Sequence, residues 1–196
     1  MNYKKEHLGL NQFSERTYDY LSINFPEILE DAIFEKSDSG NNFLRIEKQC
    51  PNPKAEYGLY FDSNDDEFTV GFDCFHCHFY RFAEQDFDSE LTNAVRMIKD
   101  ILNNELFLLK IVNGHRYLGS QFIEKKELDS LDKIIGEWNL KSNEQGRIVS
   151  WDGYFDQEVE RKNESSTIHK SNGGASLNLK VSENKNLWQK LKEMWS

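Results

Sequence analysis

The 196-residue chain has few cysteines and no long apolar run, and both features limit the cellular compartment in which we expect it. Its three cysteines, Cys50, Cys74 and Cys77, do not form the even, regularly spaced framework that stabilises small secreted domains. The first seven residues lead into no apolar signal region, and the longest apolar stretch, Leu106 to Val112, is too short to span a bilayer. We therefore expect a cytoplasmic protein in a reducing compartment, without membrane insertion.

Familiar catalytic motifs are also missing from the sequence. The chain contains no glycine-rich phosphate loop, no nucleophile elbow and no His-Glu-x-x-His pattern. The usual sequence evidence for an enzyme that depends on a common cofactor is therefore absent. We predict a non-enzymatic protein with no catalytic residue and no cofactor.

Positive charge is scarce in this protein. The 24 Lys and Arg residues face 34 Asp and Glu residues, which gives a formal net charge of -10. Such a negative field repels phosphate backbones and anionic membranes and attracts basic partners. The basic residues are scattered and form no run. We therefore expect a protein partner with a basic surface and no direct binding to nucleic acid.

The hydrophobic pattern indicates an α+β fold with a mostly antiparallel sheet. Helices are predicted within 18–34, at about 87–104 and at 125–135, and strands at 43–48, 57–61, 68–80, 106–112, 117–123 and 146–155. The polar run 62–67 and the dipeptide Asn113-Gly114 each predict a hairpin turn. We predict a single domain over 1–160, followed in 161–196 by a flexible connection and a short C-terminal helix that packs on the domain or on a partner.

The strand predicted at 68–80 contains the cluster Cys74-Phe75-His76-Cys77-His78. Side chains alternate across a strand, so Cys74, His76 and His78 would share one face. A His-x-His pair on a strand can bind zinc or another transition metal, with Cys74 as a soft third ligand. The competing interpretation is a buried cysteine with histidines at a sheet end or in a groove that faces a partner. A metal-binding protein or metal-dependent hydrolase centred on these three residues is the alternative function.

A cysteine nucleophile is a further alternative for the same segment. Cys77 and His76 are adjacent on the predicted strand, so they point to opposite faces and do not meet. A catalytic dyad would need Cys74 together with His76 or with the distant His115. Because a free cysteine near a histidine is common by chance, this alternative ranks below the zinc site.

Acidic residues flank the predicted strand on both sides. Such clusters are often only solvated surface, but here they would lie at both ends of a unit that contains aromatic residues. Carboxylates around aromatic anchors make an effective interface for a basic target. The predicted partner-binding residues are Asp62, Asp65, Asp66, Glu67, Asp73, Glu84, Asp86 and Asp88.

The sequence contains the segment Glu67-Phe68-Thr69-Val70-Gly71-Phe72-Asp73, followed by His76, His78-Phe79 and then the helix and apolar strand to Val112. This arrangement resembles a pattern in small bacterial proteins encoded beside toxins. These proteins are the immunity proteins of polymorphic-toxin and contact-dependent growth-inhibition systems. The resemblance covers residues 57–112 and leaves both terminal regions unexplained. It implies a cytosolic protein that binds one cognate toxin domain, often a nuclease, and blocks its active site or an adjacent surface. It assigns no contact residue. The prediction is an immunity protein that neutralises a cognate, basic toxin.

Overall fold

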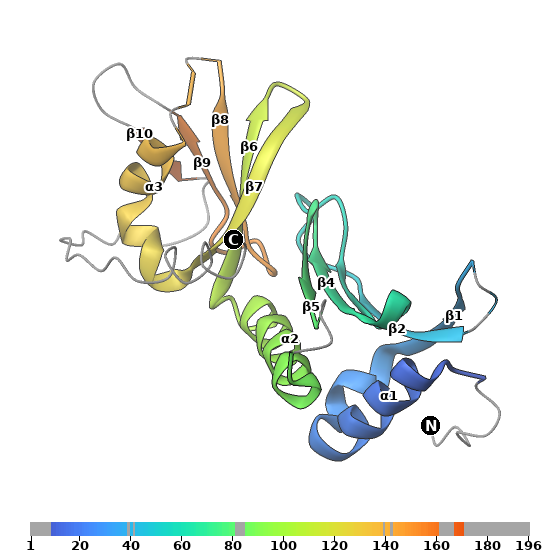
Figure 1. Ribbon diagram of the computed structural model, residues 1–196. Coiled ribbons are helices and arrows are strands. Elements are labelled where there is room, and N and C mark those ends of the chain that lie inside the picture. The colour runs from blue at the N-terminus through green and yellow to red at the C-terminus, as the bar shows by residue number, and fades with distance from the viewer. Residues whose placement is uncertain are drawn as a thin grey trace.

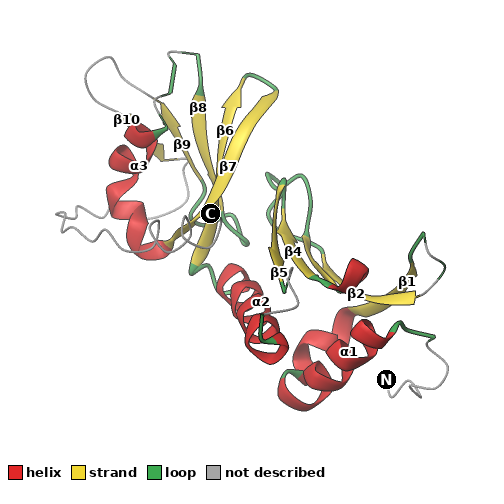
Figure 2. Cartoon of the chain, viewed as in Figure 1, coloured by secondary structure: helices red, strands yellow, loops and turns green. Residues whose placement is uncertain are grey.

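The computed structural model describes residues 9–38, 40, 42–80, 85–138, 140–141, 143–160 and 167–170. These residues form two antiparallel five-stranded sheets with several helices, which confirms the predicted α+β fold (Figure 1). Figure 2 shows the two sheets as separate groups of yellow strands with α2 below them. Within the described ranges, no helix has the length and apolar character needed to cross a membrane.

The first sheet, here called the N-terminal sheet, has the strand order β1-β2-β3-β4-β5. Its strands are β1 (Ala32–Lys36), β2 (Asn42–Lys48), β3 (Leu59–Asp62), β4 (Phe68–Phe72) and β5 (Phe75–Phe79). The helices that accompany it are α1 (Gln12–Asn24), the 3-10 helix η2 (Pro26–Asp31), the short 3-10 helix η3 (Asn64–Asp66) and α2 (Phe87–Leu102). All neighbouring strands are antiparallel, and the predicted hairpin around 62–67 is confirmed as β3–β4.

The helices cover one face of this sheet, which we call the inner face. Its side chains alternate along each strand with those of the opposite face, and Leu44, Phe61 and Val70 are almost completely buried. They pack in one cluster with the apolar stripe of α2, which includes Leu91 and Ile98. Burying a side chain of this size contributes about 1.5–3 kcal/mol, so this face carries much of the stability of the fold. Figure 1 shows α1 and α2 below the sheet.

The second sheet has the strand order β10-β9-β8-β6-β7. Its elements are β6 (Leu106–Asn113), β7 (Arg116–Glu124), the 3-10 helix η4 (Lys125–Ser130), α3 (Leu131–Glu137), β8 (Gln145–Val149), β9 (Gln157–Glu160) and β10 (Thr167–Lys170). On one face of β6, Leu109 packs in a second hydrophobic cluster with Ile135 of α3. On the other face, Leu108 belongs with Val149 to the core cluster of the N-terminal sheet. Burial on both faces explains the continuous apolar run of β6.

Three predicted elements are corrected by the structure. The strand predicted at 146–155 is shorter, because β8 ends at Val149 and 150–155 form no strand. Residues 68–80 are not one strand, because β4 and β5 pair antiparallel with Phe72 opposite Phe75, and Asp73-Cys74 is the turn between them. Asp73 has a φ of 53°, a left-handed conformation that Asp adopts more readily than most other residues. The helical pattern predicted to continue to 34 ends earlier, since 32–36 form β1 and pair with β2.

The end of the chain is only partly described. Strand β10 lies inside the segment predicted to be a flexible connection. The predicted C-terminal helix lies outside the described residues, and the single-domain boundary at residue 160 stays a prediction.

Candidate functional site

The face of the N-terminal sheet opposite α1 and α2 is the candidate site, and we call it the outer sheet face. Its side chains are Ile33, Glu35, Phe43, Arg45, Glu47, Tyr60, Asp62, Glu67, Thr69, His76 and His78, and Phe43 among them is buried. Strand register sets them in cross-strand rows, one of which runs Ile33, Arg45, Asp62, Thr69, His78. The described helices that pack on this sheet do so through the inner-face core, so none of them covers this surface.

Arg45 is surrounded by carboxylates on this face. Its Nε is 2.7 Å from Glu47 Oε1 and 3.9 Å from Glu35 Oε2, and its Nη1 is 3.5 Å from Asp62 Oδ2. Burial lowers the pKa of Arg45, but the hydrogen bond to Glu47 and the three negative charges outweigh burial and raise the pKa overall. Burial also raises the pKa of Asp62, an effect that the Asn64 amide and Arg45 only partly offset. One guanidinium is therefore shared by three carboxylates.

Tyr60 lies directly over Gly71, the residue opposite it on β4. A Cβ atom at Gly71 would lie 2.0 Å from Tyr60 Cε1, so the ring occupies space that only glycine leaves open. The guanidinium carbon of Arg45 is 4.9 Å from the ring centroid, within the range of a cation–π contact. Burial, and then the charge of Asp62, raise the pKa of the Tyr60 hydroxyl, so it stays neutral at physiological pH. Arg45 and Tyr60 thus form a preorganised pair.

Histidines complete the outer sheet face along β5. His78 Nδ1 is 2.7 Å from Glu67 Oε1 and 3.2 Å from Thr69 Oγ1. The ring of His76 is exposed, and its centroid is 5.0 Å from that of His78 at an interplanar angle of 85°. The histidines therefore share a face, as the alternation of the strand predicts, but Glu67 and Thr69 are the groups that hold His78.

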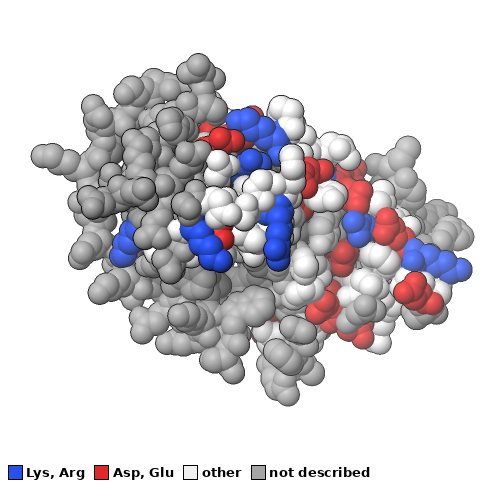
Figure 3. Space-filling model, turned by 90° about the horizontal axis from the view of Figure 1, so that it is seen from above, with Lys and Arg blue, Asp and Glu red and all other residues white. Residues whose placement is uncertain are grey.

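Acidic side chains gather over this part of the molecule. Figure 3 views the protein from the side opposite α1 and α2, and shows red carboxylate residues over the N-terminal sheet, on the right. Basic residues lie mainly toward the middle of the view. On the side of the molecule seen in this view, the acidic residues therefore gather toward the N-terminal sheet.

Asp73, one of the predicted partner-binding residues, lies in the interior instead. Its side chain has no exposed surface, and its Oδ2 is 2.6 Å from Nζ of Lys110 on β6. Its Oδ1 accepts a hydrogen bond from the Glu56 amide at 2.9 Å. Burial lowers the pKa of Lys110, but the contact with Asp73 outweighs burial and raises it. Asp73 therefore joins the two sheets, and its carboxylate does not reach a surface where a partner would dock.

The other predicted acidic residues are divided between two places. Asp86 caps α2, because its carboxylate accepts a hydrogen bond from the Ser89 amide, and Asp88 forms an ion pair with Arg16 at 3.1 Å. Both lie at the start of α2, away from the outer sheet face. Asp66 is exposed in η3, between Asp62 and Glu67. Asp65 also lies in η3 with its side chain outside the described part of the structure, and Glu84 lies outside the described residues.

The alternative metal site is not assembled by this arrangement. Cys74 lies in the turn, whereas His76 and His78 lie on β5. In the part of the chain that the structure describes, no group of three or more His, Cys, Asp or Glu side chains is placed to hold a metal ion. Burial raises the pKa of Cys74 and raises that of Cys77 to about 11, so both thiols stay protonated at neutral pH. Since the thiolate is the metal ligand and the nucleophile, the geometry favours neither zinc binding nor a cysteine hydrolase.

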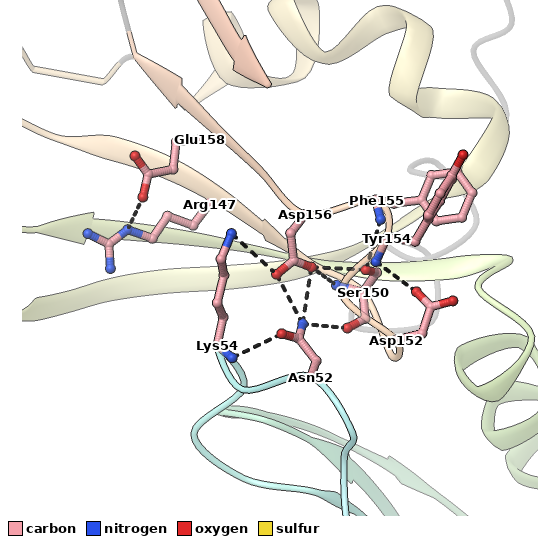
Figure 4. Close-up of polar contacts among 9 residues, drawn as sticks. All are labelled: Asn52, Lys54, Arg147, Ser150, Asp152, Tyr154, Phe155, Asp156 and Glu158. Atoms are coloured by element: carbon pink, nitrogen blue, oxygen red, sulfur yellow. Dashed lines mark hydrogen bonds and ion pairs between the residues drawn. The ribbon is translucent and has the colours of Figure 1, made fainter. Parts of the chain in front are cut away.

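A buried polar network joins the two sheets beside this site (Figure 4). The amide nitrogen Nδ2 of Asn52, in the β2–β3 loop, donates to the Ser150 carbonyl at 2.8 Å and to the Asp156 carboxylate at 3.0 Å. Asp156 also accepts hydrogen bonds from the amide and hydroxyl of Ser150. All three residues are buried. The network fixes the loop that leads into β3, which carries Tyr60 and Asp62.

Comparison of the chain with protein-family models, with curated proteins and with solved structures gives no match. The site must therefore be interpreted from its own geometry.

Proposed function

We propose that this protein is an immunity protein that binds and neutralises a cognate toxin domain with a basic surface, such as a nuclease, through the outer sheet face. The observation that carries the proposal is the excess of carboxylates around Arg45 and Tyr60 on a sheet face that no described helix covers. The carboxylates on this face belong to Glu35, Glu47, Asp62 and Glu67.

Physical chemistry supports a protein target with positive charge. Carboxylates on an open face attract such a target over several ångströms and increase its association rate. Tyrosine and arginine are among the residue types that most often dominate binding energy, especially when neighbouring contacts hold them in place. A nuclease must present positive charge to bind a phosphate backbone, so an acidic face is suited to covering its substrate-binding surface. The resemblance of residues 57–112 to toxin-associated immunity proteins supports the same partner class.

The test requires a toxin domain identified in the gene neighbourhood of this chain, and its substitutions neutralise charge without adding bulk. The double substitution Glu47→Gln and Asp66→Asn removes two exposed carboxylates at the outer sheet face and its margin. Asn suits position 66 because its φ is 59°, in the left-handed region that Asn also tolerates. We expect the Kd to rise about 5- to 30-fold, since each exposed charge contributes a modest amount. Isothermal titration at several salt concentrations should also give a weaker salt dependence.

A matched control makes the same change in charge elsewhere. Asp129→Asn with Glu105→Gln neutralises two carboxylates on the second sheet, where Asp129 is exposed in η4 and Glu105 pairs with Lys125. This control should bind the toxin with nearly wild-type affinity. Equal losses in both double variants would show only a general field effect and would remove the outer sheet face as the interface. Failure of the wild-type chain to bind or inhibit the toxin domain would refute the proposed function itself.

A further inference from the structure

The edge strands of the two sheets are protected to different degrees. An unpaired edge offers free amide and carbonyl groups to any other strand, and proteins usually block such edges with charges, prolines or bulges. Strand β1 carries Glu35 and Lys36, and β10 carries Lys170. Strand β7 begins at Arg116 and has a bulge opposite Ile111 and Val112. Each of these three edges therefore has a feature that opposes pairing.

Strand β5 has none of these features. Its sequence, Phe-His-Cys-His-Phe, contains no Lys, Arg, Asp, Glu, Gly or Pro, and its pairing with β4 is regular from end to end. It is the last strand of the N-terminal sheet, and no strand in the described ranges pairs with its other edge. An edge this regular and this free of charge is suited to accept another strand.

The sequence of β5 also reads the same in both directions around Cys77. Two copies paired antiparallel about a two-fold axis at Cys77 would place Phe75 opposite Phe79, His76 opposite His78, and Cys77 opposite itself. Every cross-strand pair would then join identical residue types, and the inner and outer faces would continue from one copy into the other. We propose that β5 is a self-association edge, through which two copies of this chain join their N-terminal sheets into one continuous antiparallel sheet.

The surroundings of β5 are compatible with this pairing. Phe75 contacts Phe122 of β7 with ring centroids 5.0 Å apart, and Phe75 and Phe79 pack against the core that α2 shares. These contacts are made by inner-face side chains, so they approach the strand from one face of the sheet, and no strand of the described residues pairs with its other edge. Because burial keeps the Cys77 thiol protonated, two such thiols would meet as neutral groups.

Charge also favours this edge over the rest of the surface. Two chains of formal charge -10 repel each other, so association is least opposed where carboxylates are absent. Strand β5 has none, and the carboxylate of its outer-face neighbour Glu67 contacts His78 Nδ1 at 2.7 Å. Cross-strand pairs contribute about 0.2–1 kcal/mol each, and the new backbone hydrogen bonds add to them. A second copy is therefore the occupant that fits both the sequence and the charge of the strand.

The first experiment measures the mass of the full chain in solution and needs no toxin. Light scattering after size exclusion should give about twice the chain mass of 23.1 kDa. His76→Lys introduces at the edge the residue type that natural edges use against pairing, and should return the protein to a monomer. The control Ser120→Lys makes a comparable change on the β7 edge and should remain a dimer. Far-ultraviolet circular dichroism verifies that each variant is folded.

The second experiment tests the register of the pairing. In a chain carrying Cys50→Ser, Cys74→Ser and Cys77→Ser, one variant receives His76→Cys and another receives His78→Cys. Directly opposite residues are about 4.5–5.5 Å apart, within disulfide reach, whereas each new cysteine is about 7–8 Å from its own copy. Oxidation of the mixture should therefore give the mixed disulfide dimer, and either variant alone should give little.

Either of two results would overturn the proposal. One is a monomeric mass for the wild-type chain at protein concentrations up to about 100 µM, where a dimer of micromolar affinity would be populated. The other is cross-linking of each single variant with itself as efficiently as with the other. Neither experiment involves the toxin. A monomeric chain would therefore not contradict the proposed function, and failure to bind a toxin would not contradict the dimer.

Discussion

Replacement of Lys110 by Met should lower the free energy of unfolding by about 3–5 kcal/mol, the usual cost of removing one partner of a buried ion pair. The Asp73 side chain has no exposed surface and the Lys110 side chain is 7% exposed, so water cannot replace the missing ammonium group. In the variant, the Asp73 carboxylate retains only the Glu56 amide as a hydrogen-bond donor, at 2.9 Å. Met keeps most of the aliphatic volume of Lys, so the loss would be mainly electrostatic.

A double-mutant cycle separates the pair from its surroundings. Urea unfolding followed by circular dichroism would compare Lys110→Met, Asp73→Asn and the double variant with the wild type. Asn is chosen because Asp73 has a φ of 53°, which Asn also tolerates. We expect the double variant to lose less stability than the two single losses combined, by about 1–3 kcal/mol. Additive losses, or a loss below about 1 kcal/mol for Lys110→Met, would refute the account of this pair as the link between the sheets.

The pH dependence gives an independent check of the same pair. The pKa of Lys110 is raised in the folded state, so its contribution to stability is complete below the ordinary lysine pKa and is lost as the pH rises through the folded value. The difference in stability between wild type and Lys110→Met should therefore stay constant from neutral pH to about pH 9 and shrink above about pH 10.5. A difference that shrinks already near pH 8 would contradict this assignment.

Two further substitutions test local geometry. Gly71→Ala should lower the free energy of unfolding by about 1–3 kcal/mol, measured by thermal unfolding, because the new Cβ collides with the Tyr60 ring. The loss should largely disappear in a Tyr60→Ala background. An unchanged melting temperature would show that the ring does not lie over Gly71. Asp86→Ala should lower the free energy of unfolding by about 1 kcal/mol, because it removes the cap of α2. In urea unfolding, Asp86→Asn should remain close to wild type, because Asn caps equally well. Equal losses in both variants would exclude the cap as the cause.

Elements set by local sequence were predicted well. The apolar stripe from Phe87 through Leu91 and Ala94 gives α2, with Asp86 as its cap. The hairpin at Asn113-Gly114 is also confirmed, although the turn itself is Gly114-His115, with Asn113 paired to Arg116. In both cases the residues that decide the structure lie within a few positions of one another.

The missed features depend on contacts between distant segments. The turn at Asp73-Cys74 has no glycine or proline to signal it, and its Asp is held by Lys110 from the second sheet. The Asn52–Ser150 contact joins residues 98 positions apart, which no local pattern predicts. In the candidate site, Asp62 and Glu67 are among the residues that the sequence predicts to bind a partner, and this stays a prediction. Arg45 and Tyr60 are not among them, because their importance follows from strand register.

Existing contacts of the carboxylates on the outer sheet face limit how this face would bind a basic partner. Glu35, Glu47 and Asp62 already share Arg45, and Glu67 Oε1 lies 2.7 Å from His78 Nδ1. A positive group from a partner would therefore compete with an existing contact and would not meet free carboxylates, which reduces the net gain from each new ion pair. Affinity would then depend on the fit around Tyr60, and charge would mainly set association rate and orientation. For this reason the double neutralisation at Glu47 and Asp66 should slow association more than it speeds dissociation.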